Sequence, residues 1–188
     1  MSERRVHNII IFVGALFLLT FSIVYAYDDG FASARKTEGG HFTIYYAPKI
    51  DSIGLAQQLN ISPADKILAS GSTKGLSGLA GMVDTLFTQV CDILDMQLYS
   101  YQGSIKICQD YNQLNQIYKT LFSEDLGGMF AFYVNDFNTI YISQENFKRS
   151  VLGHEIAHAI ISHYFVVQSP LKVQEVLAGY VEYQLRKQ

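Results

Sequence analysis

A short stretch near the C-terminus constrains the fold more than any other feature of this chain. In it, His154, Glu155 and His158 interrupt an otherwise apolar run. The apolar residues recur with the period of one helix face, and they are Leu152, Ile156, Ala159 and Ile160. Residues four apart on a helix lie on the same side, because a turn takes about 3.6 residues. We therefore expect a helix over residues 146–164, with one face in a core and the two histidines together on another.

The residue types at these positions are those that hold a zinc ion and activate water on it. The imidazoles of His154 and His158 can reach one metal ion from the same helix face. Glu155 lies a quarter-turn away, where its carboxylate can act as general base on zinc-bound water. A catalytic zinc site needs three protein ligands and leaves a fourth position open. The sequence offers Glu175, on the next predicted helix, as the third ligand of Zn²⁺.

That next helix is predicted over residues 170–187, because a serine and a proline provide its cap and first position. The face that carries Glu175 also carries Ala178, Gly179 and Glu182. Small residues there would let the two helices approach closely. Glu182 is either a partner that orients a ligand imidazole or an ordinary exposed glutamate, and the pattern leaves both open.

The remaining pattern predicts short strands and helices. Strands are expected where aromatic and β-branched residues gather, at residues 41–47, 104–109, 129–134 and 139–143. Helices are expected at residues 52–59, 79–98 and 111–122, with a short one beginning after Ser62 and a flexible loop over 70–78. The last two strands form a hairpin around residues 135–138. We expect an α+β fold, in which a mostly antiparallel sheet is packed with helices and the histidine-bearing helix precedes the glutamate-bearing one.

The first residues carry a targeting pattern. Arg4 and Arg5 precede an apolar run over residues 9–25, and two aspartates follow it. Because positive residues stay on the cytoplasmic side of a membrane, everything after the run is expected outside the cytoplasm. The run is either a signal peptide cleaved after Ala26 or a retained membrane anchor. The predicted division is a leader at 1–26, a polar linker at 27–40 and one domain at 41–188.

Composition limits the choice of partners. The formal net charge is −3 and the basic residues are scattered, so the chain lacks the basic stripe that binding to nucleic acid requires. Hydrophobic residues make up 49% of the 188 residues and charged ones 16%, which fits one globular domain. The two cysteines, Cys91 and Cys108, either form a disulfide or remain buried thiols. Cys108 falls on the opposite strand face from Ile105 and Ile107, which argues against a bridge to a helix on the isoleucine side.

Two segments together resemble the gluzincin metallopeptidases, whose third zinc ligand is a glutamate on the helix after HExxH. Residues 154–158 read HEIAH, and residues 175–183 read EVLAGYVEY. The second segment is similar to the N-E-G-F-A-S-Y-V-E-Y of the aminopeptidase N-like branch. It departs from that pattern at Gln174 and Val176, and it keeps Glu175, Ala178, Tyr180, Val181, Glu182 and Tyr183. The resemblance covers roughly residues 127–185. It implies a minimal, single-domain zinc peptidase, with strand 139–143 as the edge strand that pairs with an extended peptide.

One departure limits the expected substrate. Gly127, Gly128 and Met129 match the start of the G-[AG]-M-E-N strand of those aminopeptidases, but Phe130 stands where their glutamate binds a free amine. The expected activity is therefore that of an extracytoplasmic zinc endopeptidase acting on a peptide or protein, with Glu155 as catalytic base. The alternative is a catalytically silent, membrane-tethered, metal-containing binding domain. An intact Glu155 favours the enzyme, because a structural site needs no base.

Several further residues receive weaker assignments. The family's oxyanion-stabilising tyrosine has no clear counterpart, and the unranked candidates are Tyr141, Tyr164, Tyr180 and Tyr183. His163 lies nine residues after His154 and is expected on the opposite helix face, as a cation at the helix C-terminus. His41 and His7 are expected to be structural.

Overall fold

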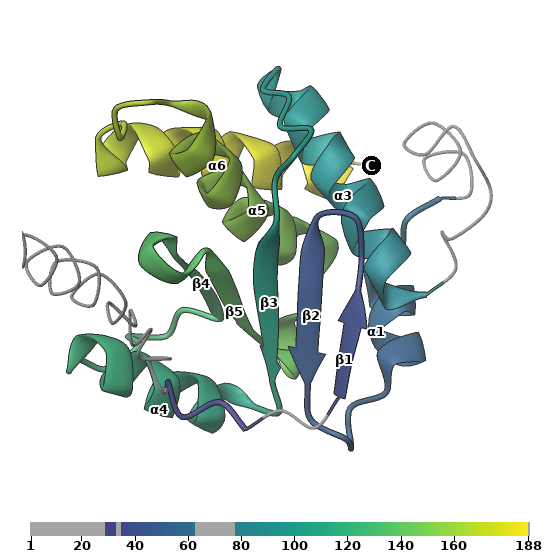
Figure 1. Cartoon of the computed structure of the whole chain (residues 1–188). Helices are drawn as coiled ribbons and strands as arrows, with labels where there is room; N and C mark the ends of the chain where they lie inside the picture. Colours follow the sequence, from purple (N-terminus) through teal and green to yellow (C-terminus); the bar gives the residue numbers. More distant parts are fainter. Residues whose placement is uncertain (1–28, 33–34, 63–77, 188) are drawn as a thin grey trace, which may run out of the picture.

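The computed structural model describes residues 29–32, 35–62 and 78–187. Within these ranges the chain forms one sheet with helices on both of its faces (Figure 1). The leader at residues 1–26, the short helix predicted after Ser62 and almost all of loop 70–78 lie outside them. In the described part of the chain, no helix is both long and apolar enough to cross a membrane.

The sheet contains both parallel and antiparallel strand pairs. Its strands are β1 (Arg35–Glu38), β2 (Phe42–Tyr46), β3 (Gly103–Cys108), β4 (Ala131–Val134) and β5 (Thr139–Ser143), in the order β1-β2-β3-β5-β4. The two outer pairs, β1–β2 and β4–β5, are antiparallel, whereas β2–β3 and β3–β5 are parallel. The α+β class is confirmed, but the expectation of a mostly antiparallel sheet is wrong. Connections that contain helices separate the parallel strands, and such crossovers are what parallel pairing requires.

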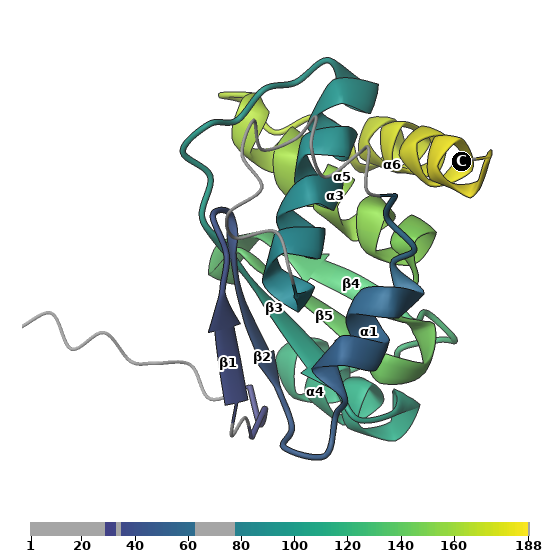
Figure 2. The same ribbon diagram turned by 90° about the vertical axis from the view of Figure 1, so that its right-hand side faces the viewer.

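Helices cover the two faces of the sheet unequally. They are α1 (Ser52–Gln58), α3 (Leu79–Leu94), α4 (Tyr111–Phe122), α5 (Arg149–Tyr164) and α6 (Leu171–Lys187). α4 packs alone on one face over a small core. The other four lie on the opposite face, with α6 stacked outside α5, as Figure 2 shows in a side view. The larger core between them contains the fully buried Ile44, Ile105 and Ile140.

Local sequence sets where the helices beside the site begin and end. Asp110 caps α4, because its carboxylate accepts a hydrogen bond from the Gln113 N–H at 2.9 Å. α3 stops at Leu94 instead of the predicted residue 98, since Asp95 adopts the left-handed conformation with φ of 54°. The Arg149 guanidinium, at the start of α5, donates to the Gln89 side chain of α3 at 2.9 Å. This bond fixes the first turn of α5 against its neighbour.

Two predictions about the sheet are wrong. β5, expected as the edge strand, lies between β3 and β4, and all five of its residues are buried. The strand at this end of the sheet is β4. Residues 27–40, expected as a linker, contain β1, whose Arg35 pairs with Tyr46 of β2. The hairpin of β4 and β5 around residues 135–138 is confirmed.

Asp29 fixes the same N-terminal stretch to the α4 side of the sheet. Its buried carboxylate hydrogen-bonds the Lys106 ammonium and the Tyr141 hydroxyl, and it accepts from the Phe31 N–H at 3.0 Å. Burial by itself raises the pKa of this carboxyl, but these three hydrogen bonds together hold the pKa below its usual value. Asp29 is therefore a charged anchor inside the segment that was expected to be a linker.

Both cysteines are buried free thiols. Cys91 lies in the larger core and Cys108 on the α4 side, as the alternation of β3 predicted. Burial raises the pKa of Cys91 to about 11 and that of Cys108 to about 12. Neither is a reactive thiolate at neutral pH.

Candidate metal centre

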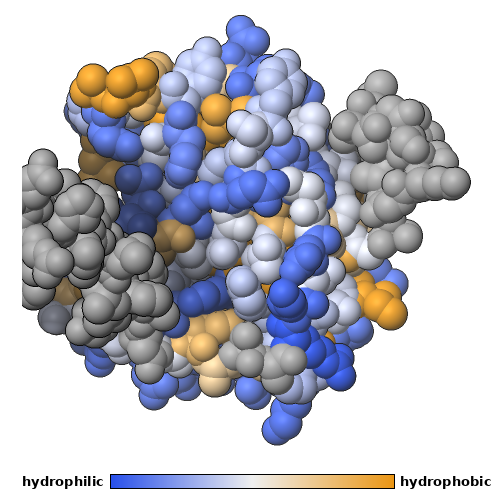
Figure 3. All heavy atoms as spheres, in the orientation of Figure 1, coloured by the Kyte–Doolittle hydropathy of each residue, from blue (hydrophilic) through white to orange (hydrophobic). Residues whose placement is uncertain are grey.

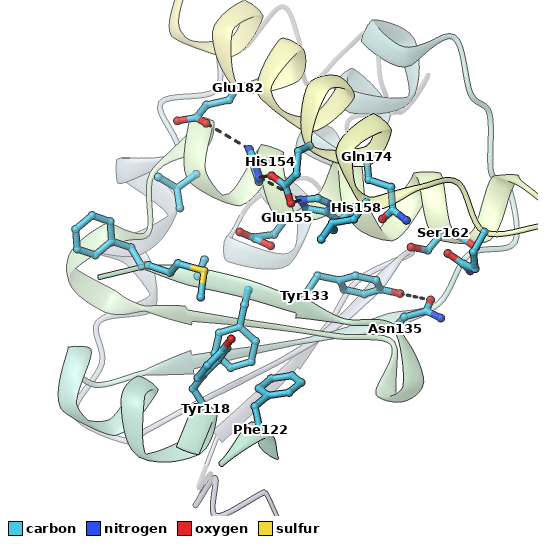
Figure 4. Close-up of a pocket in the computed structure, with 18 residues that line it drawn as sticks. Tyr118, Phe122, Tyr133, Asn135, His154, Glu155, His158, Ser162, Gln174 and Glu182 are labelled. Atoms are coloured by element: carbon cyan, nitrogen blue, oxygen red, sulfur yellow. Dashed lines mark hydrogen bonds and ion pairs between the residues drawn. The ribbon is translucent and has the colours of Figure 1, made fainter. Parts of the chain in front are cut away.

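α5 carries the histidine motif through the middle of the larger core. The four residues predicted to face that core, Leu152, Ile156, Ala159 and Ile160, are all fully buried. On another side of the helix, His154 and His158 face α6 and an open cleft (Figure 4). The two-faced helix expected from the sequence is confirmed.

The two imidazoles and the Glu175 carboxylate converge on one point. The Nε2 atoms of His154 and His158 are 3.1 Å apart. Glu175 Oε2 lies 3.7 Å from His154 Nε2, and Glu175 Oε1 lies 3.5 Å from His158 Nε2. In a tetrahedral zinc site with bonds of about 2.0–2.1 Å, ligand atoms are separated by about 3.3–3.4 Å. The two imidazole nitrogens and the two oxygens of the Glu175 carboxylate lie close to these separations, so the three side chains could hold the zinc ion predicted for them.

A close helix contact brings Glu175 to the histidines. A Cβ atom at Gly153 of α5 would lie only 2.2 Å from Leu185 Cδ1 of α6, so with a side chain at position 153 either Leu185 or α6 would have to move. Ala178 is fully buried on the α6 side. Gly179 does not contribute, because a Cβ there would meet nothing within 4 Å. The expected close approach of α5 and α6 exists, but the glycine that it requires is Gly153 of α5, not Gly179 of α6.

Glu155 lies beside this cluster with 8% of its surface exposed. Burial, followed by the negative charges of Glu175 and Glu182, raises the pKa of its carboxyl to about 8. The backbone N–H of Tyr133, on β4, donates to the carboxylate and opposes this rise. Glu155 is thus held between α5 and the edge strand, and it is not one of the three groups that converge.

Two side chains of α6 contact the far sides of the imidazoles. Glu182 Oε2 lies 3.3 Å from His154 Nδ1, and the other oxygen of Glu182 accepts from the Arg186 guanidinium. Glu182 therefore lies beside a candidate ligand imidazole, although His154 Nδ1 has no hydrogen-bond partner among the described residues. Gln174 hydrogen-bonds His158 and donates to the Ser169 carbonyl at 2.8 Å. Gln174 was noticed in the sequence only as a departure from the family pattern, so its contact with a candidate ligand was missed.

His158 is itself buried among these groups. Burial, and then the neighbouring His154, lower the pKa of its imidazole, while Glu175 and the Gln174 hydrogen bond oppose the shift. The neutral ring that results is the form that binds a metal ion.

The cleft in front of the cluster has a volume of about 660 Å³. It is lined by α4, β4, α5, α6 and the segments next to them, and every acidic residue in the lining belongs to α5 or α6. Gln168 lines it from the connection between these two helices, and Leu171 lines it from the first residue of α6. The same connection exposes Val166 and Val167. Figure 3 shows a hydrophobic patch at its upper left, where this connection lies in the same view in Figure 1.

The tyrosines predicted as oxyanion candidates do not line this cleft. Tyr141 is buried on the α4 side of the sheet, where its hydroxyl donates to Asp29. Tyr164, Tyr180 and Tyr183 are largely exposed elsewhere on α5 and α6. Among the described residues, the tyrosines that line the cleft are Tyr118 and Tyr133. Both were missed, because only the final arrangement of α4 and β4 brings them to the site.

The remaining described histidines lie apart from the cluster. His163 occupies the last turn of α5, where Nδ1 lies 2.9 Å from the Ala159 carbonyl oxygen. His41 stacks on Phe87 with ring centroids 4.2 Å apart and lies 3.3 Å from the Tyr101 carbonyl oxygen. Its expected structural role is confirmed, whereas His7 lies outside the described residues.

Comparison with known proteins adds no assignment, since neither a family model nor a curated protein matches the chain. Any functional conclusion therefore depends on the residues of the centre itself.

Proposed function

We propose that this protein is a zinc-dependent endopeptidase that cleaves extended peptides outside the cytoplasm. The observation that supports it most is the convergence of His154, His158 and Glu175 on one point, with the Glu155 carboxylate buried nearby in the wall of an open cleft. A structural zinc site is closed by four protein ligands, whereas a catalytic one keeps a position for water. The described part of the chain supplies three ligand groups here.

Zinc bound by His154, His158 and Glu175 would act as a Lewis acid on the scissile carbonyl and lower the pKa of a water molecule. Neighbouring side chains would orient the two imidazoles that bind the zinc ion. Glu182, 3.3 Å from His154 Nδ1, would accept a hydrogen bond from the Nδ1–H group of His154 and so leave Nε2 free to bind the metal. The Gln174 hydrogen bond would orient the ring of His158 in a similar way.

In this proposal Glu155 acts as the general base. Its carboxylate would take a proton from the water that attacks the peptide carbonyl, so that the new C–O bond forms as the O–H bond breaks. The resulting acid would give this proton to the leaving nitrogen as the C–N bond breaks, which restores the carboxylate. Burial favours the protonated form of this carboxyl and so helps Glu155 to hold the proton between the two steps, while the positive charge of a bound zinc ion would favour the carboxylate that must first accept it.

The outer edge of β4, which borders no other described strand, suits an extended peptide. The Ser143 N–H donates to the Phe130 carbonyl at 3.2 Å, and in an antiparallel pair such bonding recurs at every second residue. The backbone groups of Ala131 and Tyr133 therefore point away from β5, and the Tyr133 N–H is directed at Glu155. Peptides are commonly bound by strand addition to such an edge. In this proposal β4 takes the role that the resemblance had assigned to residues 139–143.

Two sequence features complete the proposal. Phe130 lines the cleft where the similar aminopeptidases carry a glutamate, so this side of the cleft offers no carboxylate to a free amino terminus. Endopeptidase action is therefore preferred to aminopeptidase action. Export of the domain is proposed from Arg4 and Arg5 before the apolar run of residues 9–25.

The decisive experiment measures zinc and cleavage on the same preparations of the full chain. Wild type should contain close to one zinc per chain and cleave a quenched fluorescent peptide library. His158→Ala should lose the metal. Glu155→Gln should keep the metal and the fold, but should lose about 10²–10⁴-fold in rate, because it lacks the general base.

Other outcomes would reject parts of the proposal. Equal cleavage by wild type and Glu155→Gln would make the catalytic assignment wrong. Full zinc retention in His158→Ala would remove the ligand assignment. Zinc and peptide binding without any cleavage would favour the silent binding domain instead.

A further inference from the structure

The outer edge of β4 lies between two sides of the cleft, one lined by residues of α5 and the other by residues of α4. Side chains alternate between the two faces of a strand, so neighbouring residues of β4 point in opposite directions. Ala131 and Tyr133 belong to the face that packs toward α5. Phe132 and Val134 belong to the face that packs toward α4. The cleft extends past this edge, since residues of both α4 and α5 line it.

The α4 side presents an aromatic ledge, which we define as Tyr118, Phe122 and Phe132. The Tyr118 ring lies 4.6 Å from that of Phe122 and 5.0 Å from that of Phe132, measured between centroids. Phe132 is covered by the other two, whereas Phe122 is 44% exposed. Figure 4 shows Tyr118 and Phe122 across the strand ribbon from Glu155.

The residues that line the cleft next to the ledge are apolar as well. Met129 and Phe130, in the segment leading into β4, also line the cleft and are about half exposed. None of the residues that α4, β4 and this segment contribute to the cleft is charged. Exposed aromatic rings gathered at the mouth of a cleft are favourable to bury against an apolar group, and they disfavour an unpaired carboxylate.

We propose that the aromatic ledge is a specificity subsite for a bulky apolar side chain of the bound peptide. This inference depends on the proposed function, because it takes the substrate to be a strand added to the edge of β4. Such a strand also alternates its side chains. Residues that point toward α5 face the metal cluster and Glu155, and their immediate neighbours face Tyr118 and Phe122. The preferred substrates are therefore peptides with Phe, Leu or Met at one position and no such requirement at the adjacent positions.

The test uses fluorogenic peptides that differ only at one position, where Phe, Leu, Ala or Asp is placed in turn. Wild-type full chain should prefer Phe and Leu at a single position near the cleaved bond. Phe122→Ala should lower kcat/KM for the Phe peptide by about tenfold, since burial of an aromatic side chain contributes that much. It should leave the Ala peptide and the zinc content unchanged. Phe122→Leu should recover most of the loss. The matched control is Tyr99→Ala, because Tyr99 is exposed and lies outside the cleft.

The same variants separate failure of the subsite from failure of the proposed function. Cleavage without apolar preference, or identical selectivity in Phe122→Ala and Tyr99→Ala, would overturn the ledge while leaving the peptidase intact. If wild type cleaves nothing, the peptides are titrated against Glu155→Gln by fluorescence anisotropy. Weaker binding of the Phe peptide after Phe122→Ala would then support the ledge although the enzyme proposal had failed. Binding that is indifferent to Phe122 would reject both.

Discussion

Helices α5 and α6 each supply part of the candidate centre, but the fold holds them differently. Nine residues of α5 are buried, including Glu155 and His158, because the helix lies between the sheet, α3 and α6. Only Ala178, Val181 and Leu185 are buried in α6, which lies outside α5. The side chain of Glu175 is 53% exposed. Packing therefore fixes the base and two of the candidate ligands, whereas the third depends on where an outer helix rests.

Because of this difference, the position of α6 should depend on a bound metal ion more than the position of α5 does. α5 is positioned by the core whether or not a metal is bound. α6 is held to it by an apolar contact that includes Ala178, Val181 and Leu185 and by polar contacts at the imidazoles. A metal ion at the centre would join the helices directly, so its binding free energy would stabilise the docking of α6 much more than the structure of α5.

The largest expected effect is therefore on the opening of α6 when zinc is removed. At a free zinc concentration of about 100 times Kd, binding contributes about 2.7 kcal/mol, which is about a hundredfold in an opening equilibrium. Amide hydrogen exchange along α6 should accelerate by roughly that factor after chelation, while the buried turns of α5 stay protected. Mass spectrometry of peptic fragments from the two helices would measure both.

A ligand variant provides the control for this comparison. Glu175→Ala with zinc present should exchange in α6 at the rate of the chelated wild type, because the link from α6 to the metal is absent. Equal acceleration in α5 and α6 would show that the two helices open together, and zinc would then not stabilise α6 more than α5.

The next effect concerns Glu182. Replacing it with alanine should weaken zinc binding by about 10–100-fold, the range found when a carboxylate that orients a ligand histidine is lost. Competition with a chelating dye would measure the affinity. Arg186→Ala is the matched control, since Arg186 contacts Glu182 at the exposed side of α6. An exposed ion pair contributes about 0–1 kcal/mol, so this variant should change zinc affinity less than Glu182→Ala does. If the order were reversed, Glu182 would not orient His154.

The sequence predicted the centre better than it predicted the sheet, and the reason is local. His154 and His158 are brought together by helix geometry alone, and the apolar face of α5 follows from the same period. Glu175 needs only one neighbouring helix to be placed correctly. Such relations act over short stretches of chain, where spacing carries most of the information.

The sheet depends on pairings between distant segments. Whether β4 or β5 forms the edge is decided by which of them pairs with β3, and the hairpin pattern is compatible with either choice. Helices predicted at residues 52–59 and 79–98, between the strands predicted at 41–47 and 104–109, are compatible with a crossover and hence with a parallel pair. The strand at Arg35–Glu38 has no apolar alternation and forms by pairing with β2, so the pattern of residues 27–40 alone could not predict it. Asp29 was likewise unpredictable, because its partners are Lys106 and Tyr141 in two other strands.

The smallest effect tests the contact that positions α6. Gly153→Ala would introduce a Cβ atom 2.2 Å from Leu185 Cδ1, and Leu185 is buried, so α6 or its side chain must move. Overpacking of this kind costs about 1–3 kcal/mol, and the higher helix propensity of alanine returns about 1 kcal/mol. The free energy of unfolding should fall by about 1 kcal/mol, measured by urea denaturation of the chelated protein. Zinc affinity should fall as well, because Glu175 moves with α6.

Two further variants show whether the clash is the cause. Gly179→Ala places the same methyl group on α6 where nothing lies within 4 Å, so it should stabilise the protein by up to about 1 kcal/mol through helix propensity alone. In a Leu185→Ala background the two Leu185 atoms that meet a Cβ at Gly153, Cδ1 at 2.2 Å and Cγ at 3.7 Å, are both gone, and the remaining contact, Val181 Cγ1 at 3.8 Å, is an ordinary one. There Gly153→Ala should become neutral or stabilising, and a double-mutant cycle would report the coupling. An undiminished cost in that background would mean that Gly153 matters for α5 itself and not for its distance from α6.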